Sequence, residues 1–355
     1  MASTETDERF MRVALGEARK GLGKTSPNPA VGAVLVIKNE VIARGHHRQA
    51  GGPHAEVECL RQINRADAAR STMYLTLEPC STVGRTPPCT SEIIRAGVKR
   101  VVIGSIDVNP LHDGRGINEL RAAGIDVDVG VLGDECTTLN EAFNKWIVTR
   151  QPFVIAKCGM SLDGRLTRPP GEPAWITNAA ARRHGQKLRA TVDAILVGAE
   201  TVRTDDPRLT VRGTRGARQP WRVVVTRSGK LPRNAQLFTD RHRERTIIYR
   251  RQALSSVLQD LGTRNVTSVL IEGGGEILGQ ALDAGLIDKA QIYIGSMFTG
   301  GPVIAFGERG ASATPEAARL ERISYTRLGD NICVAGHPRF PVITRTTNNF
   351  SKPRV

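Results

Sequence analysis

Aromatic side chains are scarce in this chain: phenylalanine, tyrosine and tryptophan make up only 4% of its 355 residues. Proteins that bind single-stranded nucleic acid stack bases on aromatic rings, so this scarcity disfavours that class. The sequence has no apolar run near the roughly 20 residues that a membrane-spanning helix requires. Its start, MASTETDERF, has neither the basic region nor the apolar core of a signal peptide. We therefore expect a cytoplasmic protein with no membrane partner.

Cysteine is also sparse, with six residues in the whole chain. In a reducing compartment such residues are thiols or metal ligands rather than the framework of a disulfide-stabilised fold. The six are Cys59, Cys80, Cys89, Cys136, Cys158 and Cys333.

Basic residues give the chain a net charge of +15, but the excess is uneven. Residues 1–150 hold 19 Lys and Arg against 18 Asp and Glu. Residues 151–355 hold the other 31 Lys and Arg against 17 Asp and Glu. A protein that binds polynucleotides needs a basic surface around its site, and the first half lacks this excess. The basic second half can serve a phosphorylated cofactor or substrate, or can simply keep the protein in solution.

Helices and short apolar strands alternate in the first 150 residues, which is typical of a layered α/β domain. The apolar periodicity predicts the following elements. Expected helices are Arg9–Gly21, His54–Ala66, Pro88–Ala96, Gly116–Ala123 and Asp134–Trp146, and expected strands are Val31–Ile37, Val41–Gly45, Met73–Leu77, Arg100–Ser105 and Ile125–Val129.

A second α/β pattern begins after residue 150. We expect one domain over residues 1–150, another over 151–342, and a basic, disordered tail over 343–355. Expected strands of the second domain are Phe153–Ala156, Ala194–Val197, Arg222–Thr226, Thr246–Tyr249, Ser268–Ile271 and Lys289–Ile294, and expected helices are Ala179–Ala190, Gln252–Gly262 and Glu276–Ala284.

One histidine and two cysteines form the strongest chemical motif, His54-Ala-Glu56 followed by Pro79-Cys80 and Cys89. One imidazole and two thiolates leave the fourth position of a tetrahedral zinc ion open for a water molecule, whose pKa falls to about 7. Glu56 lies two residues after the histidine and can carry a proton from that water to a leaving amine. The pattern resembles the zinc deaminase signature. A structural zinc site with a fourth protein ligand, such as Cys59, is the alternative.

Eight residues separate Cys80 from Cys89, where nucleoside and nucleic-acid deaminases usually have two. With this insert the chain resembles the bifunctional deaminase/reductase family of riboflavin biosynthesis over roughly residues 9–340. The matching motifs are Ser26-Pro27-Asn28-Pro29, Val31-Gly32-Ala33-Val34, His54-Ala55-Glu56-Val57, Thr76-Leu77-Glu78-Pro79-Cys80-Ser81, Gly84-Arg85-Thr86-Pro87-Pro88-Cys89, Asn109-Pro110, Ser161-Leu162-Asp163-Gly164-Arg165, Trp175-Ile176-Thr177 and Asp205-Asp206-Pro207.

For the first domain, the resemblance implies a cytidine-deaminase-like three-layer fold that removes an amine from a diaminopyrimidinone ribosylamine 5′-phosphate, with one Zn²⁺ per chain. Glu56 would be the catalytic residue, and His54, Cys80 and Cys89 the metal ligands. Alone, an asparagine before a proline is more often a turn residue, and His47 would be a surface histidine. Thr82 departs from the histidine that the family commonly has. The resemblance implies that the substrate contacts are Asn28, His47, Arg85, Thr86, Asp107 and Asn109.

For the second domain, the resemblance implies a dihydrofolate-reductase-like α/β fold that uses NADPH to reduce the ribosyl group of the deaminated product. The glycines after Glu272 allow backbone amides to approach a phosphate, although, taken alone, they are better explained by a tight turn between strand and helix. Pro173 and Ser296-Met297 depart from the family pattern. The implied NADPH contacts are Gly159, Trp175, Thr177, Thr201, Asp205 and Gly274, and the implied substrate contacts are Lys157, Arg189, Leu209, Arg212 and Glu272.

The resemblance therefore implies an enzyme that takes small phosphorylated pyrimidine substrates and forms a homo-oligomer, although the sequence itself does not fix the oligomeric state. Two alternatives stay open. The first is that only one of the two halves is active, which the departures from the family pattern at Thr82, Pro173 and Ser296-Met297 suggest. The second is that the zinc domain acts on nucleic acid, which the net charge suggests.

Overall fold

The computed structural model describes residues 4–82, 87–166, 175–214 and 216–341. It divides into two compact units. Unit 1 contains residues 1–153 and 183–270, and unit 2 contains residues 154–182 and 271–355. The expected tail, Arg85, Thr86 and Pro173 lie outside the described residues.

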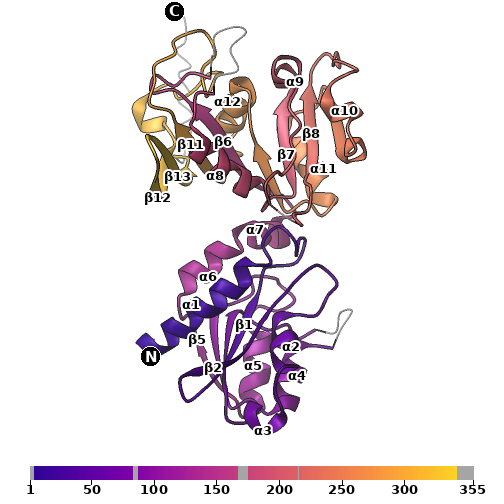
Figure 1. The fold of residues 1–355 in the computed structure, drawn as a ribbon, viewed down its shortest axis with the longest axis vertical. Helices are drawn as coiled ribbons and strands as arrows, with labels where there is room; N and C mark the ends of the chain where they lie inside the picture. Colours follow the sequence, from indigo (N-terminus) through magenta and orange to yellow (C-terminus); the bar gives the residue numbers. More distant parts are fainter. Residues whose placement is uncertain (1–3, 83–86, 167–174, 215, 342–355) are drawn as a thin grey trace, which may run out of the picture. The chain divides into compact units, whose positions relative to one another are not determined.

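The first 150 residues form a five-stranded mixed sheet with the strand order β2-β1-β3-β4-β5 (Figure 1). β1 pairs antiparallel with both β2 and β3, and β3, β4 and β5 are parallel. Because parallel strands end at one edge of a sheet, the loops after β3 and β4 lie close together. The strands are β1 Gly32–Ile37, β2 Glu40–His46, β3 Thr72–Leu77, β4 Arg100–Ser105 and β5 Asp126–Val129.

Helices cover both faces of this sheet and bury a separate apolar core on each (Figure 1). On one face, Phe10 and Met11 of α1 and Cys136 of α6 pack against alternate strand residues. On the other face, α2, α4 and α5 supply residues such as Cys59 and Ile93. The expected three-layer fold is therefore confirmed. The helices are α1 Glu5–Arg19, α2 Ala55–Leu60, α3 Arg65–Ala68, α4 Cys89–Ala96, α5 Arg115–Ala122, α6 Gly133–Leu139 and α7 Glu141–Thr149.

Two expected helices are wrong in length, because each is interrupted. The helix after His54 ends at Leu60, and a new one begins beyond Asn64, whose side chain accepts the amide hydrogen bond of Asp67 at its N-terminus. The other break falls at Asn140, between α6 and α7. Its side chain makes two buried hydrogen bonds to the backbone of Ala30, at 2.8 and 3.0 Å.

The remaining strands form an eight-stranded sheet with the order β12-β13-β11-β6-β10-β7-β8-β9. β6 is parallel to β11, and β7, β8 and β9 are parallel to one another. β13 pairs antiparallel with β11 and β12, and the sequence pattern did not predict this terminal hairpin. The strands are β6 Phe153–Met160, β7 Ala194–Gly198, β8 Trp221–Thr226, β9 Thr246–Arg250, β10 Ser268–Ile271, β11 Lys289–Ile294, β12 Arg319–Leu328 and β13 Asn331–Arg339.

The helices of this part are α8 Ala179–Arg189, α9 Ala199–Asp205, α10 Gln236–Thr239, α11 Leu254–Thr263 and α12 Gly275–Asp283, with short 3₁₀ turns at Arg243–Arg245 and Thr314–Glu316. Within the described ranges, every helix is too short or too polar to cross a membrane.

Candidate functional site

His54, Cys80 and Cys89 come together at the carboxyl end of β3, although 35 residues of sequence separate the first from the last. His54 precedes α2, Cys80 lies in the loop after β3, and Cys89 begins α4. The Nδ1 atom of His54 lies 3.2 Å from Sγ of Cys89 and 3.6 Å from Sγ of Cys80. The three donor atoms all lie within 4.8 Å of one another, so a single metal ion can contact all of them.

One nitrogen and two sulfur donors are ligands that zinc prefers. The two thiols share a hydrogen bond, which lowers the pKa of Cys80 to about 4. The backbone amide of Cys89 also donates to Sγ of Cys80, as amides at a helix N-terminus do to a thiolate. Cys59 lies in the apolar core, where burial raises its pKa to about 12, and it is not part of the cluster. The alternative of a four-ligand structural site that includes Cys59 is therefore wrong.

Glu56 is 3% exposed and lies on the first turn of α2, next to the cluster. Its Oε2 atom has no hydrogen-bond partner within the described ranges. Burial is the largest cause that raises the pKa of this carboxyl group, and the nearby Cys80 adds to it. An unpartnered buried carboxyl oxygen costs free energy, so it points to a group that is meant to contact a ligand.

Asn28 and His47 lie side by side beside the three metal-ligand candidates. The amide nitrogen of Asn28 lies 3.2 Å from Nε2 of His47, and the ring centroids of His47 and His54 are 5.3 Å apart. Nδ1 of His47 lies 2.9 Å from the carbonyl oxygen of Pro53. His47 is only 2% exposed, and burial lowers its pKa, so the view that it would be a surface histidine is wrong.

Asp107 and Asn109 lie in the loop after β4, at the same edge of the sheet. Asp107 is buried, its pKa is raised by that burial, and its carboxylate accepts the backbone amide of Asn109 at 2.9 Å. The structure thus places both residues with the other candidates at this end of the sheet. Arg85 and Thr86 fall outside the described residues, and Thr82 is half-buried just before them.

Glu78 holds the loop after β4 in place, a function that the sequence analysis did not assign. Its buried carboxylate accepts backbone amides from Asp107 at 3.1 Å, Gly114 at 3.0 Å and Gly116 at 2.9 Å. The signal available in the sequence was the acidic residue itself, which is rare at the buried end of an apolar strand.

In unit 2 the candidate cofactor residues are Gly159, Trp175, Thr177 and Gly274. Gly159 on β6 faces Thr177, and a Cβ atom at Gly159 would lie 3.0 Å from the methyl group of Thr177. Trp175 is 58% exposed, and the Arg182 guanidinium lies over its ring. Gly274 is the N-cap of α12.

The substrate candidates of unit 2 are Lys157, whose ammonium group lies 5.7 Å from the ring centroid of Tyr293, and the half-buried Glu272. Ser296 donates a hydrogen bond to the carbonyl oxygen of Asp330, and Met297 is exposed.

In unit 1 the other candidates lie around α8 and α9. Arg189 at the end of α8 donates to the carbonyl oxygen of Thr210 at 3.3 Å, next to the buried Leu209. The backbone amide of Arg212 donates to the side chain of Gln186 on the same helix. Thr201 and Asp205 lie on α9.

A family model for the RibD C-terminal domain matches residues 152–334, which is more than half of the chain. The chain belongs to the RibD family. A model for the cytidine and deoxycytidylate deaminase zinc-binding region matches residues 4–105. Riboflavin biosynthesis protein RibD of Aquifex aeolicus is 35% identical over 350 residues and covers 93% of this chain and 98% of that protein. RibD of Escherichia coli is 38% identical over 326 residues and covers 83% and 89%.

The fold of this chain matches those of solved RibD structures over nearly its whole length. Acinetobacter baumannii RibD superposes with a TM-score of 0.85 at 35% identity and covers 94% of this chain and 99% of its own. A Thermotoga maritima diaminohydroxyphosphoribosylaminopyrimidine deaminase/5-amino-6-(5-phosphoribosylamino)uracil reductase gives 0.84 at 33% identity, with the same coverage. The expected cytidine-deaminase-like and dihydrofolate-reductase-like folds are confirmed, as are the two RibD cofactors, Zn²⁺ and NADPH. A deaminase that acts on nucleic acid is not favoured.

Proposed function

We propose that this chain catalyses two successive steps of riboflavin biosynthesis. The first is the hydrolytic deamination of a diaminopyrimidinone ribosylamine 5′-phosphate. The second is the NADPH-dependent reduction of the ribosyl group of 5-amino-6-(5-phosphoribosylamino)uracil to ribityl. The observation that carries this proposal is the cluster of His54, Cys80 and Cys89 with the unpartnered carboxyl oxygen of Glu56, in a chain that matches both domains of RibD.

For deamination, His54, Cys80 and Cys89 hold the zinc ion, which when bound supplies a Lewis acid that activates water. Glu56 takes a proton from the attacking water and delivers it to the departing amine, so that water enters and ammonia leaves. The buried position of Glu56 keeps bulk solvent from competing for that proton.

Asn28 and His47 hold the pyrimidine ring over this site. Because Nδ1 of His47 bonds to a carbonyl oxygen, it carries the proton, and Nε2 accepts from the amide group of Asn28. This arrangement fixes the orientation of the Asn28 side chain, which leaves its carbonyl oxygen to accept from the substrate. Arg85, Thr86, Asp107 and Asn109 contact the rest of the substrate, and a guanidinium group suits its phosphate.

For reduction, NADPH supplies the hydride, and the protein orients the two reactants. Gly159, Trp175, Thr177, Thr201, Asp205 and Gly274 contact the cofactor. The absence of a side chain at Gly159 lets the Thr177 side chain pack closely against β6, which keeps these two proposed cofactor contacts together. Lys157, Arg189, Leu209, Arg212 and Glu272 contact the phosphorylated substrate.

Two further properties belong to this proposal. We propose that the protein is cytoplasmic, and its six cysteines, which are all free thiols, suit a reducing compartment. We also propose that the chain forms a homo-oligomer.

Separate assays of the two steps test whether both halves are active. Deamination is followed without NADPH, and reduction is followed with the deaminated compound supplied directly. Turnover in both assays supports the bifunctional enzyme. Turnover in only one would reduce it to a single active half, and turnover in neither, with zinc bound, would overturn the assignment.

A further inference from the structure

The loop between α1 and β1, residues 20–31, carries Asn28 and is fixed on both sides of it. After Asn28, the backbone of Ala30 is held by the side chain of Asn140, at 2.8 and 3.0 Å. Before Asn28, the hydroxyl group of Ser26 donates to the carboxylate of Asp193 at 2.7 Å. Asn140 belongs to the deaminase domain, whereas Asp193 lies 167 residues after Ser26, within the segment that matches the reductase.

Asp193 is 3% exposed and lies just before β7 in unit 1. Besides Ser26, its Oδ2 atom accepts from the backbone amide of Thr267 at 2.8 Å and from the hydroxyl group of Thr267 at 2.7 Å. The guanidinium group of Arg218 lies 3.5 Å from Oδ1 and also donates to the carbonyl oxygen of Ser26, at 3.4 Å. A buried carboxylate with this many partners defines the position of each of them.

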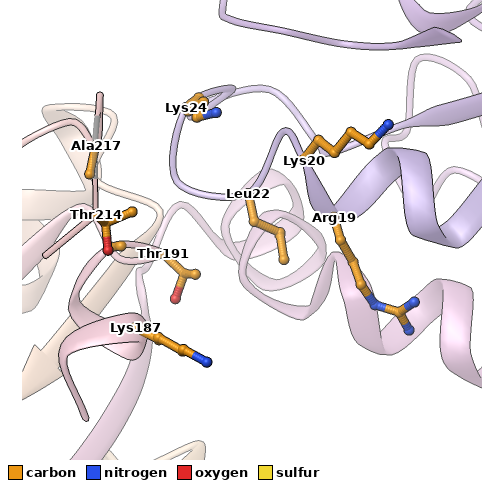
Figure 2. Close-up of a pocket in the computed structure, with 9 residues that line it drawn as sticks. Arg19, Lys20, Leu22, Lys24, Lys187, Thr191, Thr214 and Ala217 are labelled. Atoms are coloured by element: carbon orange, nitrogen blue, oxygen red, sulfur yellow. The ribbon is translucent and has the colours of Figure 1, made fainter. Parts of the chain in front are cut away.

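The same junction is closely packed at Gly23. A Cβ atom at Gly23 would lie 1.9 Å from the carbonyl oxygen of Ala190, so the loop backbone can reach the turn after α8 only because this residue is glycine. A pocket of about 250 Å³ opens beside the contact, between Leu22 and Lys24 of the loop and Thr191 of the turn (Figure 2).

The pocket itself is not a convincing anion site, although it is lined by Arg19, Lys20, Lys24 and Lys187. The side chains of Arg19 and Lys20 point in different directions (Figure 2). Arg19 and Lys187 also lie in the last turns of α1 and α8, where cations offset the negative end of a helix dipole.

We propose that Asp193 is a positioning residue for deamination: by binding Ser26, it fixes the loop that places Asn28 against His47 and the substrate. The contacts run from Asp193 to Ser26, along two residues of backbone to Asn28, and then over 3.2 Å to His47. The reductase segment thereby completes the substrate site of the deaminase domain. This inference rests on the proposed deaminase function.

The alternative is that Asp193 only stabilises its own surroundings through Thr267. Ser26→Ala separates the two explanations, because it removes the hydrogen bond to the loop and leaves both bonds from Thr267 in place. Ser71→Ala is the matched control, since Ser71 is a buried serine of the deaminase domain whose hydroxyl group donates to the carbonyl oxygen of Ala68 and not to the loop.

The experiment uses the full-length, zinc-loaded protein and measures deamination kinetics together with amide hydrogen exchange. We expect Ser26→Ala to raise KM for deamination about tenfold and to change kcat less than twofold, because the loop binds substrate and transition state alike. We expect Asp193→Asn to act in the same direction, and amides of residues 21–31 to exchange faster in both variants. Ser71→Ala should change neither quantity, and the reduction step should be unaffected by Ser26→Ala.

A second control, Asp240→Asn, removes a carboxylate of the same unit that binds Arg222 at 2.7 Å. If it raised KM for deamination as much as Asp193→Asn, the effect would be general and the proposal would be wrong. Unchanged KM and unchanged exchange in Ser26→Ala would also overturn it, with the deaminase function intact. If the wild-type protein did not deaminate the substrate, the proposed function would fall, and unchanged exchange of the loop would still refute the positioning by Asp193.

Discussion

Replacing Glu56 by glutamine keeps the shape of the side chain and removes its ability to carry a proton. General acid–base catalysis contributes about 10²- to 10⁴-fold to a rate, and Glu56 transfers a proton both when water attacks and when the amine departs. We therefore expect the kcat for deamination to fall by about 10³-fold or more. Because Oε2 has no partner within the described ranges, the change breaks no hydrogen bond of that atom. The free energy of unfolding should consequently fall by less than about 1 kcal/mol, or rise.

The assay measures deaminated product by mass without NADPH, alongside the zinc content and the reduction of supplied deaminated product. We expect Glu56→Gln to keep one zinc ion per chain and full reductase activity. Glu58→Gln is the matched control, since Glu58 lies on the same helix but forms ion pairs with Arg48 and Arg61. A Glu56→Gln protein that retains zinc and deaminates within tenfold of the wild-type rate would refute the reasoning.

Three further outcomes follow from the packing and charges. Cys80→Ser should lower the zinc content measured by elemental analysis from one ion per chain to nearly none, and full retention would contradict the ligand assignment. The pKa of Asp7 is lowered chiefly by its hydrogen bond with Arg100, so the pair stabilises the protein above about pH 4 and this stability is lost as the pH falls further. Denaturant unfolding should show Asp7→Asn about 3 kcal/mol less stable at pH 7, with a gap that narrows in acid; a constant gap would contradict this. A Cβ atom at Gly279 would lie 1.7 Å from a backbone carbonyl oxygen, whereas at Gly16 it would meet no atom within 4 Å. Gly279→Ala should therefore cost about 3 kcal/mol or more, and Gly16→Ala should gain about 1 kcal/mol, whereas equal melting temperatures would contradict the packing.

Strands that are buried on both faces were the most predictable part of the fold. Arg100–Ser105 is built around the apolar run Val101–Ile103 and Lys289–Ile294 around the apolar run Ile292–Ile294, and both strands have the bounds expected from the sequence. The hairpin strand Arg319–Leu328 was missed because charged residues interrupt it and nearly all its side chains are exposed, so it has no continuous buried run that marks a strand. The break at Asn140 was missed for another reason: its side chain bonds to Ala30, 110 residues away, which no local pattern reveals.

The chemistry of the deaminase site was predictable because His54, Glu56, Cys80 and Cys89 are the residue types that zinc hydrolysis requires, in two short motifs. The environment around them was not. The burial of His47 depends on how its loop packs in the folded chain.

The functions of Glu78 and Asp193 also depend on tertiary structure. Each carboxylate binds partners that are distant in sequence, among them the amide of Gly116 and the hydroxyl group of Ser26. A sequence motif identifies the reacting groups, whereas the groups that position them become visible only in the fold.

Product analysis of the purified, zinc-loaded protein with the diaminopyrimidinone ribosylamine 5′-phosphate tests the whole assignment. We expect one amine to be replaced by oxygen without NADPH, and two hydrogens to be added only when NADPH is also present. Recovery of unchanged substrate from protein that holds one zinc ion per chain would contradict the assignment.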